Sequence, residues 1–164
     1  MSAAPYVITA AMVGAETSRE QTPYLPITAE EIAEDAARCR EAGVAMVHLH
    51  VRTAEGKPSQ DAELFRAAIR AIRARCDVLI QTSTGGAVGM TADERCGPLT
   101  LTGADRPDMA TLTTGTVNFG DEVFMNAPRD ILALAERMHR HGVVPELEIY
   151  EAGMLESAFR LQKQ

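Results

Sequence analysis

The sequence predicts an α/β fold in which helices cover a parallel sheet. Short apolar segments with strand character alternate regularly with amphipathic helical patterns, and turn residues separate the two kinds of segment. This βαβα order is typical of parallel sheets, because a crossover helix joins each strand to the next. The order runs along the whole chain without a linker or a low-complexity segment, so we expect residues 1–164 to form a single domain.

Five segments are predicted to be strands because they are short, apolar and bounded by Gly, Pro or polar turn residues. They cover residues 6–12, 45–51, 78–84, 109–114 and 145–150. The third of these runs directly into Gly85 and Gly86. A loop around residues 56–58 follows the second strand, and a long loop over 115–126 follows the fourth.

The helices between these strands are predicted from capping signals and apolar stripes. Thr28 begins the first helix, Glu31 completes its capping box, and Gly43 ends it. Thr91 and Glu94 form a second capping box, which opens a short helix. Further amphipathic helices are expected over residues 61–75, 128–141 and 154–163.

Two closures of the sheet remain open: an open doubly wound sheet, or the start of an eight-stranded βα barrel. A dinucleotide-binding open sheet would normally carry GxGxxG after its first strand, where this chain has Val-Gly-Ala-Glu at 13–16. In barrels, functional groups gather at the carboxyl ends of the strands. Residues of that kind lie at the carboxyl ends of the first four strands, one or two from each: Glu16, His48, His50, Ser83 and Thr111. The pattern favours a barrel, although a complete one typically needs about 250 residues.

The second strand carries a His-x-His pair inside an apolar run. Because strand side chains alternate with a period of two, His48 and His50 share one face, with Met46 beside them. Their bases stand about 6.6 Å apart, which suits two rings leaning toward one metal ion. The alternative is a pair of buried histidines bonded to backbone or carboxylate partners, and the shared face favours the metal. Val47, Leu49 and Val51 take the other face.

Composition and charge exclude several partners. The formal net charge is −7 and no Lys/Arg run is interleaved with aromatic residues, so we expect no nucleic-acid partner. No apolar segment has transmembrane length, so we expect no membrane partner. Cys39, Cys76 and Cys96 form no CxxC pair and are odd in number, which indicates reduced thiols and a cytoplasmic location.

Taken together, the motifs resemble the β-keto acid cleavage enzyme family over essentially the whole chain and in the family's order. The matching segments are TAA at 9–11, GAE at 14–16, LPITAEE at 25–31, HLHVR at 48–52, GKPSQ at 56–60, QTSTGGAVG at 81–89, MATL at 109–112, GTVNFGD at 115–121 and VPELEIYE at 144–151. The resemblance is greatest to members that cleave 3-keto-5-aminohexanoate in lysine fermentation. It implies a (β/α)8 TIM barrel of which this chain supplies about the first five βα units.

The resemblance also implies a zinc ion held by His48, His50 and a glutamate. That glutamate lies in a Gly-x-Glu-Asp-Asn motif beyond the family's seventh strand, near an arginine and an aspartate of the base machinery. All of these lie beyond Gln164, so we expect the catalytic base outside this chain. The implied reaction is an acyl transfer: a β-keto acid and acetyl-CoA give acetoacetate and a new acyl-CoA. We expect these two small molecules as partners, and a homo-oligomer.

Four residues are expected to contact substrate by their match to the family: Glu16, Ser83, Gly86 and Thr111. The carboxylate of Glu16 would pair with an ammonium group of the substrate, whereas on residues alone it is a solvated loop carboxylate. The hydroxyls of Ser83 and Thr111 would lie near substrate oxygens, and Gly86 would let the backbone approach an anion.

Four further residues are weaker candidates, and no role is assigned to them: Arg52, Asn118, Glu146 and Glu148. Arg52 equally suits a salt bridge that holds a loop, and Asn118 could satisfy backbone groups within its own loop. Glu146 and Glu148 share one face of the fifth strand and could point into a barrel. One alternative to an active enzyme stays open: a non-catalytic truncated remnant, or a half-barrel that needs a partner chain.

Overall fold

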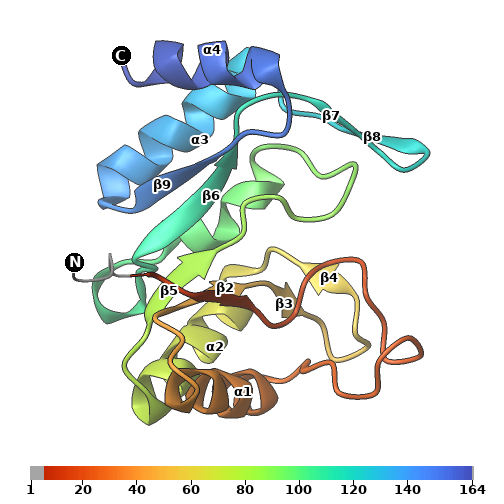
Figure 1. Ribbon diagram of the computed structural model, residues 1–164, viewed down its shortest axis with the longest axis vertical. Coiled ribbons are helices and arrows are strands. Elements are labelled where there is room, and N and C mark those ends of the chain that lie inside the picture. Colours follow the sequence, from red (N-terminus) through yellow and green to blue (C-terminus); the bar gives the residue numbers. More distant parts are fainter. Residues whose placement is uncertain (1–5, 164) are drawn as a thin grey trace, which may run out of the picture.

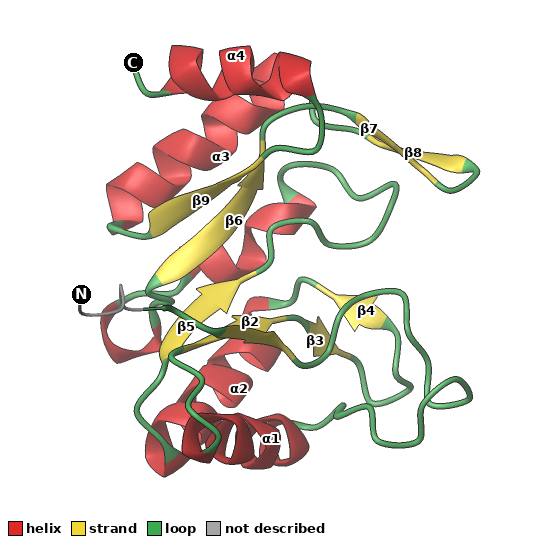
Figure 2. Cartoon of the chain, viewed as in Figure 1, coloured by secondary structure: helices red, strands yellow, loops and turns green. Residues whose placement is uncertain are grey.

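The computed structural model describes residues 6–163 and is built on a five-stranded parallel sheet (Figures 1 and 2). The strands are β1 (Thr9–Ala11), β2 (Met46–Leu49), β5 (Leu79–Thr82), β6 (Met109–Thr113) and β9 (Val144–Glu148). Their order in the sheet is β1-β2-β5-β6-β9, the order in which they occur along the chain. This confirms the predicted five parallel strands as an incomplete βα barrel, and the doubly wound alternative is excluded.

Four α-helices flank the sheet: α1 (Ala29–Glu41), α2 (Ala62–Arg75), α3 (Pro128–His141) and α4 (Ala152–Leu161). The capping box that begins α1 is formed as predicted, because Thr28 accepts from the Glu31 N–H and Glu31 accepts from the Thr28 N–H. Gly142 ends α3 in the left-handed conformation, with φ of 65°. The predicted helices are therefore confirmed, with α4 beginning and ending two residues earlier than expected.

Two hydrophobic clusters join the helices to one face of the sheet. The first packs Val47 and Leu49 of β2 and Ile80 of β5 against α1 and α2. The second packs Ala110 and Leu112 of β6 against α3. Because neighbouring strand residues point to opposite faces, the other face carries His48 and the residues in register with it. The apolar residues of β2, β5 and β6 thus face the helices, and the residues that alternate with them face the other side of the sheet.

The loops contain secondary structure that the sequence did not predict. The long loop after β6 holds a hairpin of β7 (Val117–Phe119) and β8 (Glu122–Phe124), and the turn around Gly56 joins a small ribbon of β3 (Val51–Arg52) and β4 (Pro58–Ser59). The helix opened by the Thr91 capping box is a 3-10 helix, η1 (Glu94–Thr100), which contains Pro98. A second 3-10 turn, η2 (Gly103–Asp105), precedes β6. In Figure 1 the β3–β4 pair and the β7–β8 hairpin both lie on the right, the side toward which the arrowheads of β5 and β6 point.

Candidate active site

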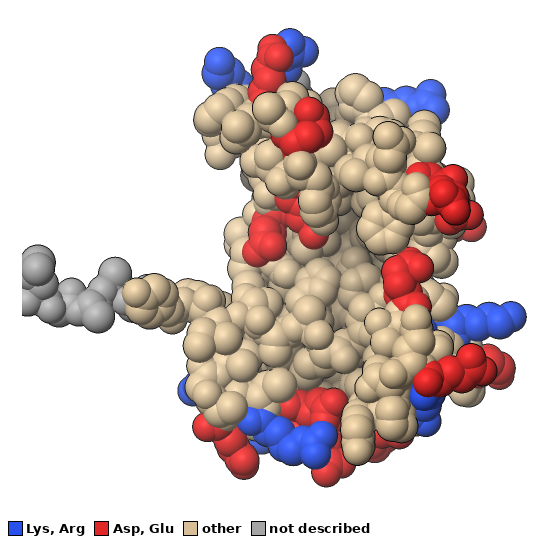
Figure 3. Space-filling view, turned by 45° about the vertical axis from the view of Figure 1, so that its right-hand side comes forward, with Lys and Arg blue, Asp and Glu red and all other residues tan. Residues whose placement is uncertain are grey.

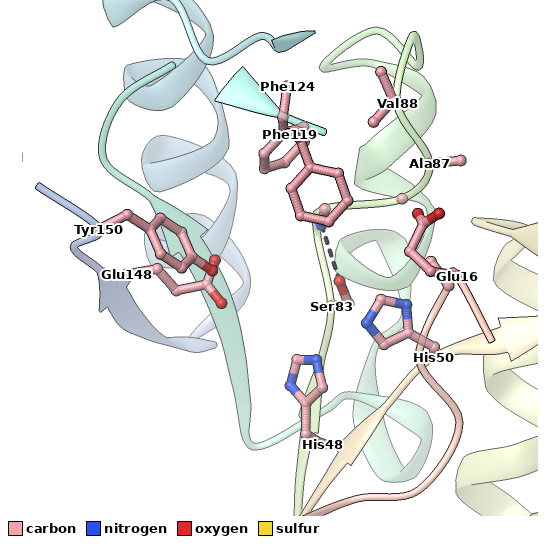
Figure 4. A pocket seen from close by; sticks show the side chains of 13 residues that line it. Glu16, His48, His50, Ser83, Ala87, Val88, Phe119, Phe124, Glu148 and Tyr150 are labelled. Carbon is pink, nitrogen blue, oxygen red and sulfur yellow. Dashed lines mark hydrogen bonds between the residues drawn. The ribbon is translucent and has the colours of Figure 1, made fainter. Parts of the chain in front are cut away.

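A cavity of about 250 Å³ lies at the carboxyl ends of the parallel strands (Figure 4). Its wall collects residues from four strand ends and from the β7–β8 hairpin: Ala15, Glu16, His48, His50, Ser83, Gly85, Gly86, Ala87, Val88, Phe119, Phe124, Glu148 and Tyr150. Of the four residues expected to contact substrate, Glu16, Ser83 and Gly86 line this cavity together with both histidines. This is the end of the sheet where barrel enzymes carry their reactive groups.

The two histidines face the same space. The centroids of their rings lie 5.0 Å apart with an angle of 64° between the ring planes. His48 belongs to β2, whereas His50 lies between β2 and β3, where the ladder is interrupted. Burial, together with the neighbouring His48 and Arg52, lowers the pKa of His50 to about 4. His50 is therefore neutral near pH 7, which is the form in which imidazole binds metals.

The ring of His48 is hydrogen-bonded to Gln81 on the adjacent strand β5, and Gln81 is bonded in turn to Glu146 on β9, two strands further along the sheet. Nδ1 of His48 lies 2.7 Å from Oε1 of Gln81, the residue in register with it on β5. Nε2 of Gln81 in turn donates to Oε2 of Glu146 on β9 at 2.9 Å. Gln81 is buried, whereas Glu146 is exposed. Glu146 does not line the cavity, and its described contact is with Gln81.

Ser83 follows β5 and opens the glycine turn. Its Oγ accepts from the N–H of Gly85 at 3.0 Å, which is the dashed line in Figure 4. A hydroxyl that accepts this bond still has its own proton to donate into the cavity. Gly86 adopts φ of 66°, and a Cβ there would come within 2.7 Å of Sδ of Met90. The positive φ favours glycine at this position, and a side chain here would have to displace that of Met90.

The loop that carries Glu16 is fixed from below by Arg52. Nη2 of Arg52 donates to the carbonyls of Gly14 at 2.9 Å and Thr17 at 2.8 Å, on either side of Glu16, and Nη1 donates to Gly56. Arg52 is buried, and this burial lowers its pKa while the charge of Glu16 opposes the change. Arg52 thus holds a loop, but it does so through backbone carbonyls and not through the salt bridge considered from the sequence. Glu16 itself is solvent-exposed at the cavity rim.

The structure does not place Thr111 or Asn118 on the cavity wall. Thr111 is buried in β6, where its Oγ1 accepts from the N–H of Thr84 at 3.3 Å and its carbonyl accepts from the Thr84 hydroxyl. Its hydroxyl therefore supports the turn that carries Ser83 and Gly86. Asn118 is exposed on β7, opposite Val123 across the hairpin.

Several wall residues were not singled out from the sequence. Phe119 and Phe124 come from the β7–β8 hairpin, and Tyr150 follows β9 (Figure 4). Glu148, a candidate without an assigned role, also lines the cavity, and its Oε2 accepts from Oγ1 of Thr113 at 2.6 Å. The alternation in the fifth strand allowed an inward Glu148. The Gly120–Asp121 pair, which forms the two-residue turn of the hairpin, is a signal that could have predicted the segment that brings the two phenylalanines.

On the face shown in Figure 3, acidic and basic side chains are interspersed around the periphery, and the middle is largely uncharged. Among residues 6–163, no helix combines the length and the apolar character needed to cross a bilayer. Within the same residues, no cluster of three or more His, Cys, Asp or Glu side chains could by itself hold a metal ion.

The fold and the cavity are those of a partial βα barrel with polar side chains gathered at the carboxyl ends of its strands. The chain belongs to the beta-keto acid cleavage enzyme family, whose model matches residues 5–164. This is a family of enzymes that includes cleavage enzymes and acetyl-CoA transferases.

Three relatives show the range of the family. The 3-keto-5-aminohexanoate cleavage enzymes of Fusobacterium nucleatum and Acetoanaerobium sticklandii are 49% and 44% identical to this chain over 160 residues. Each alignment covers 96% of this chain and 57% of the relative. The 3-oxoadipate:acetyl-CoA acetyltransferase of Cupriavidus necator is 36% identical over 97% of this chain and 55% of its own length. The chain therefore spans a little over half the length of these relatives.

A solved structure shares the fold. The ternary complex of ObcA with a C4-CoA adduct and oxalate superposes with a TM-score of 0.77 at 25% sequence identity. The match covers 86% of this chain and 34% of ObcA.

Proposed function

We propose that this chain forms part of a zinc-dependent β-keto acid cleavage enzyme. The enzyme would transfer an acyl unit between a β-keto acid, such as 3-keto-5-aminohexanoate, and acetyl-CoA, giving acetoacetate and an acyl-CoA. The observation that carries this proposal is the convergence of both histidines, Ser83 and Glu16 on one cavity in a chain 49% identical to such an enzyme.

The chain's own residues fit a zinc ion in part. His48 and His50 present two imidazoles to one space, and the lowered pKa of His50 keeps that ring neutral. Catalytic zinc sites normally use three protein ligands and leave one position open, so a third ligand must come from outside the described residues. When bound, zinc supplies a Lewis acid for the oxygens of a β-keto acid.

The other wall residues supply orientation and charge. Ser83 can donate its hydroxyl proton to a substrate oxygen, because its Oγ already accepts from Gly85. The glycine turn leaves backbone N–H groups close to the cavity, where an anionic carboxylate can approach. Glu16 stands at the rim on a loop held by Arg52, and a substrate with an ammonium group would meet its carboxylate there. This charge pairing supports an amino-bearing β-keto acid over a neutral one.

Zinc binding by the purified chain tests the metal part of the proposal. We expect wild-type protein to take up zinc, and His48→Ala to lose it, as measured by metal analysis after equilibration with zinc and removal of the unbound ion. His139→Ala is the matched control, because His139 is an exposed histidine on α3 outside the cavity. Zinc uptake that is equal in wild-type and His48→Ala protein would contradict the proposal.

One observation favours the alternative of a half-barrel that needs a partner chain. The described residues hold two candidate ligands and no cluster of three. An activity assay with acetyl-CoA and 3-keto-5-aminohexanoate distinguishes a half-barrel that needs a partner chain from a non-catalytic remnant. The assay is run on the chain alone and after adding the remaining C-terminal part of the Fusobacterium nucleatum relative. Activity that arises only after mixing supports the half-barrel, and activity in neither sample supports the non-catalytic remnant.

A further inference from the structure

A series of side-chain hydrogen bonds runs across the sheet from β2 through the adjacent strand β5 to β9, which lies two strands beyond β5. It runs from His48 on β2 through Gln81 on β5 to Glu146 on β9, with distances of 2.7 Å and 2.9 Å. We propose that Gln81, anchored by Glu146, is a positioning residue that fixes the Nδ1–H tautomer of His48 and leaves Nε2 as the metal-binding nitrogen. This inference rests on the proposed zinc site and adds the residues that orient its first ligand.

The carboxylate of Glu146 at the end of this series determines which group donates in each of the two hydrogen bonds. A carboxylate has only acceptor oxygens, so the group that Gln81 turns toward Glu146 must be its amide NH2. The other end of the same amide, the carbonyl Oε1, then faces His48. Because this oxygen can only accept, the proton between the two groups belongs to Nδ1 of His48. Nε2 of a neutral imidazole in this tautomer carries a lone pair and no proton.

The burial of Gln81 makes this arrangement costly to change. Gln81 is 2% exposed, and turning its amide round would set Oε1 against the carboxylate of Glu146 and require Nδ1 of His48 to accept a hydrogen bond in the Nε2–H tautomer. Two acceptor oxygens that face each other have no proton to share, so the observed orientation of the amide is favoured. A hydrogen-bond acceptor at the N–H that does not bind the metal fixes the ring orientation of a metal-binding histidine. Removing such an acceptor typically lowers metal affinity ten- to a hundredfold.

The other histidine is not oriented in this way. His50 lies outside the β2 ladder, and among the described residues its ring contact is with His48. Before a metal binds, the orientation of the His48 ring would therefore be fixed by its hydrogen bond to Gln81, whereas the His50 ring has no such bond among the described residues. This asymmetry predicts that removal of Gln81 affects the ring of His48 and leaves the ring of His50 unchanged.

The first test reads the tautomer without any metal. Long-range proton–nitrogen NMR correlations of the 15N-labelled chain distinguish the two tautomers, with assignment from His48→Gln and His50→Gln variants. We expect His48 to be the Nδ1–H tautomer in wild-type protein, and Gln81→Met to lose this uniform state. The same Nδ1–H pattern in Gln81→Met, or an Nε2–H tautomer in wild-type protein, would overturn the proposal.

Thr82→Val is the matched control. Thr82 is the next residue on β5 and is equally buried, but it lies on the opposite face and its Oγ1 has no hydrogen-bond partner among the described residues. It should leave the His48 tautomer unchanged. Glu146→Ala provides a second variant if Gln81→Met fails to fold, because Glu146 is exposed and its removal frees the Gln81 amide to turn. We expect Glu146→Ala to give a mixture of His48 tautomers.

Titration with zinc alone gives the second readout. Gln81→Met should bind zinc at least tenfold more weakly than wild-type protein, and Thr82→Val should bind it equally. Equal affinity of Gln81→Met and wild-type protein would overturn the positioning role while the zinc site stands. If wild-type protein binds no zinc, the proposed metal site fails, and the NMR experiment still decides whether Gln81 sets the tautomer.

Discussion

The polar side chains of the cavity are oriented by neighbours that come from other strands or loops. Gln81 holds the ring of His48, and the N–H of Gly85 turns the hydroxyl of Ser83. Arg52 holds the loop of Glu16 through carbonyls at two points. The sequence singled out several side chains that line the cavity, because their types and spacing are unusual. It could not identify Gln81 as their support, because an isolated glutamine in an apolar strand has no distinguishing pattern.

At the residue scale, Glu16 should discriminate between substrates by charge. In the complete enzyme, Glu16→Gln should reduce kcat/KM for an amino-bearing β-keto acid about fivefold to tenfold and leave a neutral β-keto acid unaffected. Glu16 is exposed at the rim, so the lost ion pair is worth about 1 kcal/mol, less than a fully buried pair. Steady-state kinetics with both substrates measures the difference.

Glu20→Gln provides the control for Glu16→Gln. Glu20 is an exposed carboxylate on the same loop and does not line the cavity. It should change neither substrate's kcat/KM. Equal losses for both substrates in Glu16→Gln would assign Glu16 to the common chemistry or to structure, and would remove the reason for preferring an amino-bearing substrate.

At the element scale, the helices and the sheet order were predictable, whereas the strand limits and the loops were not. The predicted first strand began at Tyr6, but β1 begins at Thr9, and Tyr6 is 86% exposed. An apolar run shows where a strand can form, but the length of the strand depends on how many of its residues pair with the neighbouring strand. The β7–β8 hairpin contacts Arg95, a residue about 30 positions earlier in the sequence, at Phe124 and at the carbonyl of Met125.

Arg95 should be essential for the position of the β7–β8 hairpin. Its buried guanidinium donates to the carbonyls of Thr84 and Met125 and to Oδ1 of Asn126, and it stacks on the Phe124 ring with its Cζ 4.8 Å from the centroid. Arg95→Met keeps the volume but leaves these acceptors unpaired, so we expect a loss of about 2–4 kcal/mol in the free energy of unfolding. Urea denaturation measures it.

Two comparisons make the Arg95 prediction specific. Arg95→Lys keeps the charge but lacks the planar fork, so its stability should lie between those of Arg95→Met and wild-type protein. Arg129→Met is the control, because Arg129 is exposed at the start of α3. It should leave the free energy of unfolding within about 0.5 kcal/mol of wild type. An Arg95→Met protein as stable as wild type would show that the hairpin is held by other contacts.

The capping box of α1 predicts a pH-dependent stability. Backbone N–H groups of Thr28 and Ile27, together with the Arg19 guanidinium, lower the pKa of Glu31 from 4.5 to about 2. The unfolded state therefore takes up a proton at Glu31 before the folded state does, and the stabilisation is present above pH 4.5 and lost as the pH falls toward 2. Because Glu31 is partly exposed, we expect an effect of about 1 kcal/mol.

Urea unfolding at pH 6 and pH 2.5 tests the role of Glu31. Wild-type protein should lose more stability between these two pH values than Glu31→Gln, which cannot titrate at this position. Glu30→Gln, one residue earlier in the same helical turn, should behave as wild type. An identical pH dependence in Glu31→Gln and wild-type protein would contradict a stabilising role for the carboxylate.

At the scale of the whole molecule, the sheet has two edges and an open cavity side. β1 and β9 each pair with one neighbour among the described residues. Large apolar side chains are exposed at both edges, among them Ile8, Val144 and Ile149. An exposed strand edge with apolar neighbours can pair with another chain. The alternation of strands and helices predicted this sheet. It could not show which apolar side chains are exposed to solvent, because that depends on which other elements pack against them.

Self-association of this chain is the consequence that we expect from these edges. Size-exclusion chromatography with light scattering should show a dimer or a larger species at micromolar concentration. Ile8→Lys combined with Val144→Lys should shift the chain toward the monomer, because a lysine at a strand edge disfavours pairing with a second chain. Val123→Lys is the control, since it removes a similarly exposed apolar side chain on the hairpin, away from both edges. A wild-type chain that elutes as a stable monomer would contradict pairing through the sheet edges, and an equal shift in Val123→Lys would mean that general apolar exposure drives the association.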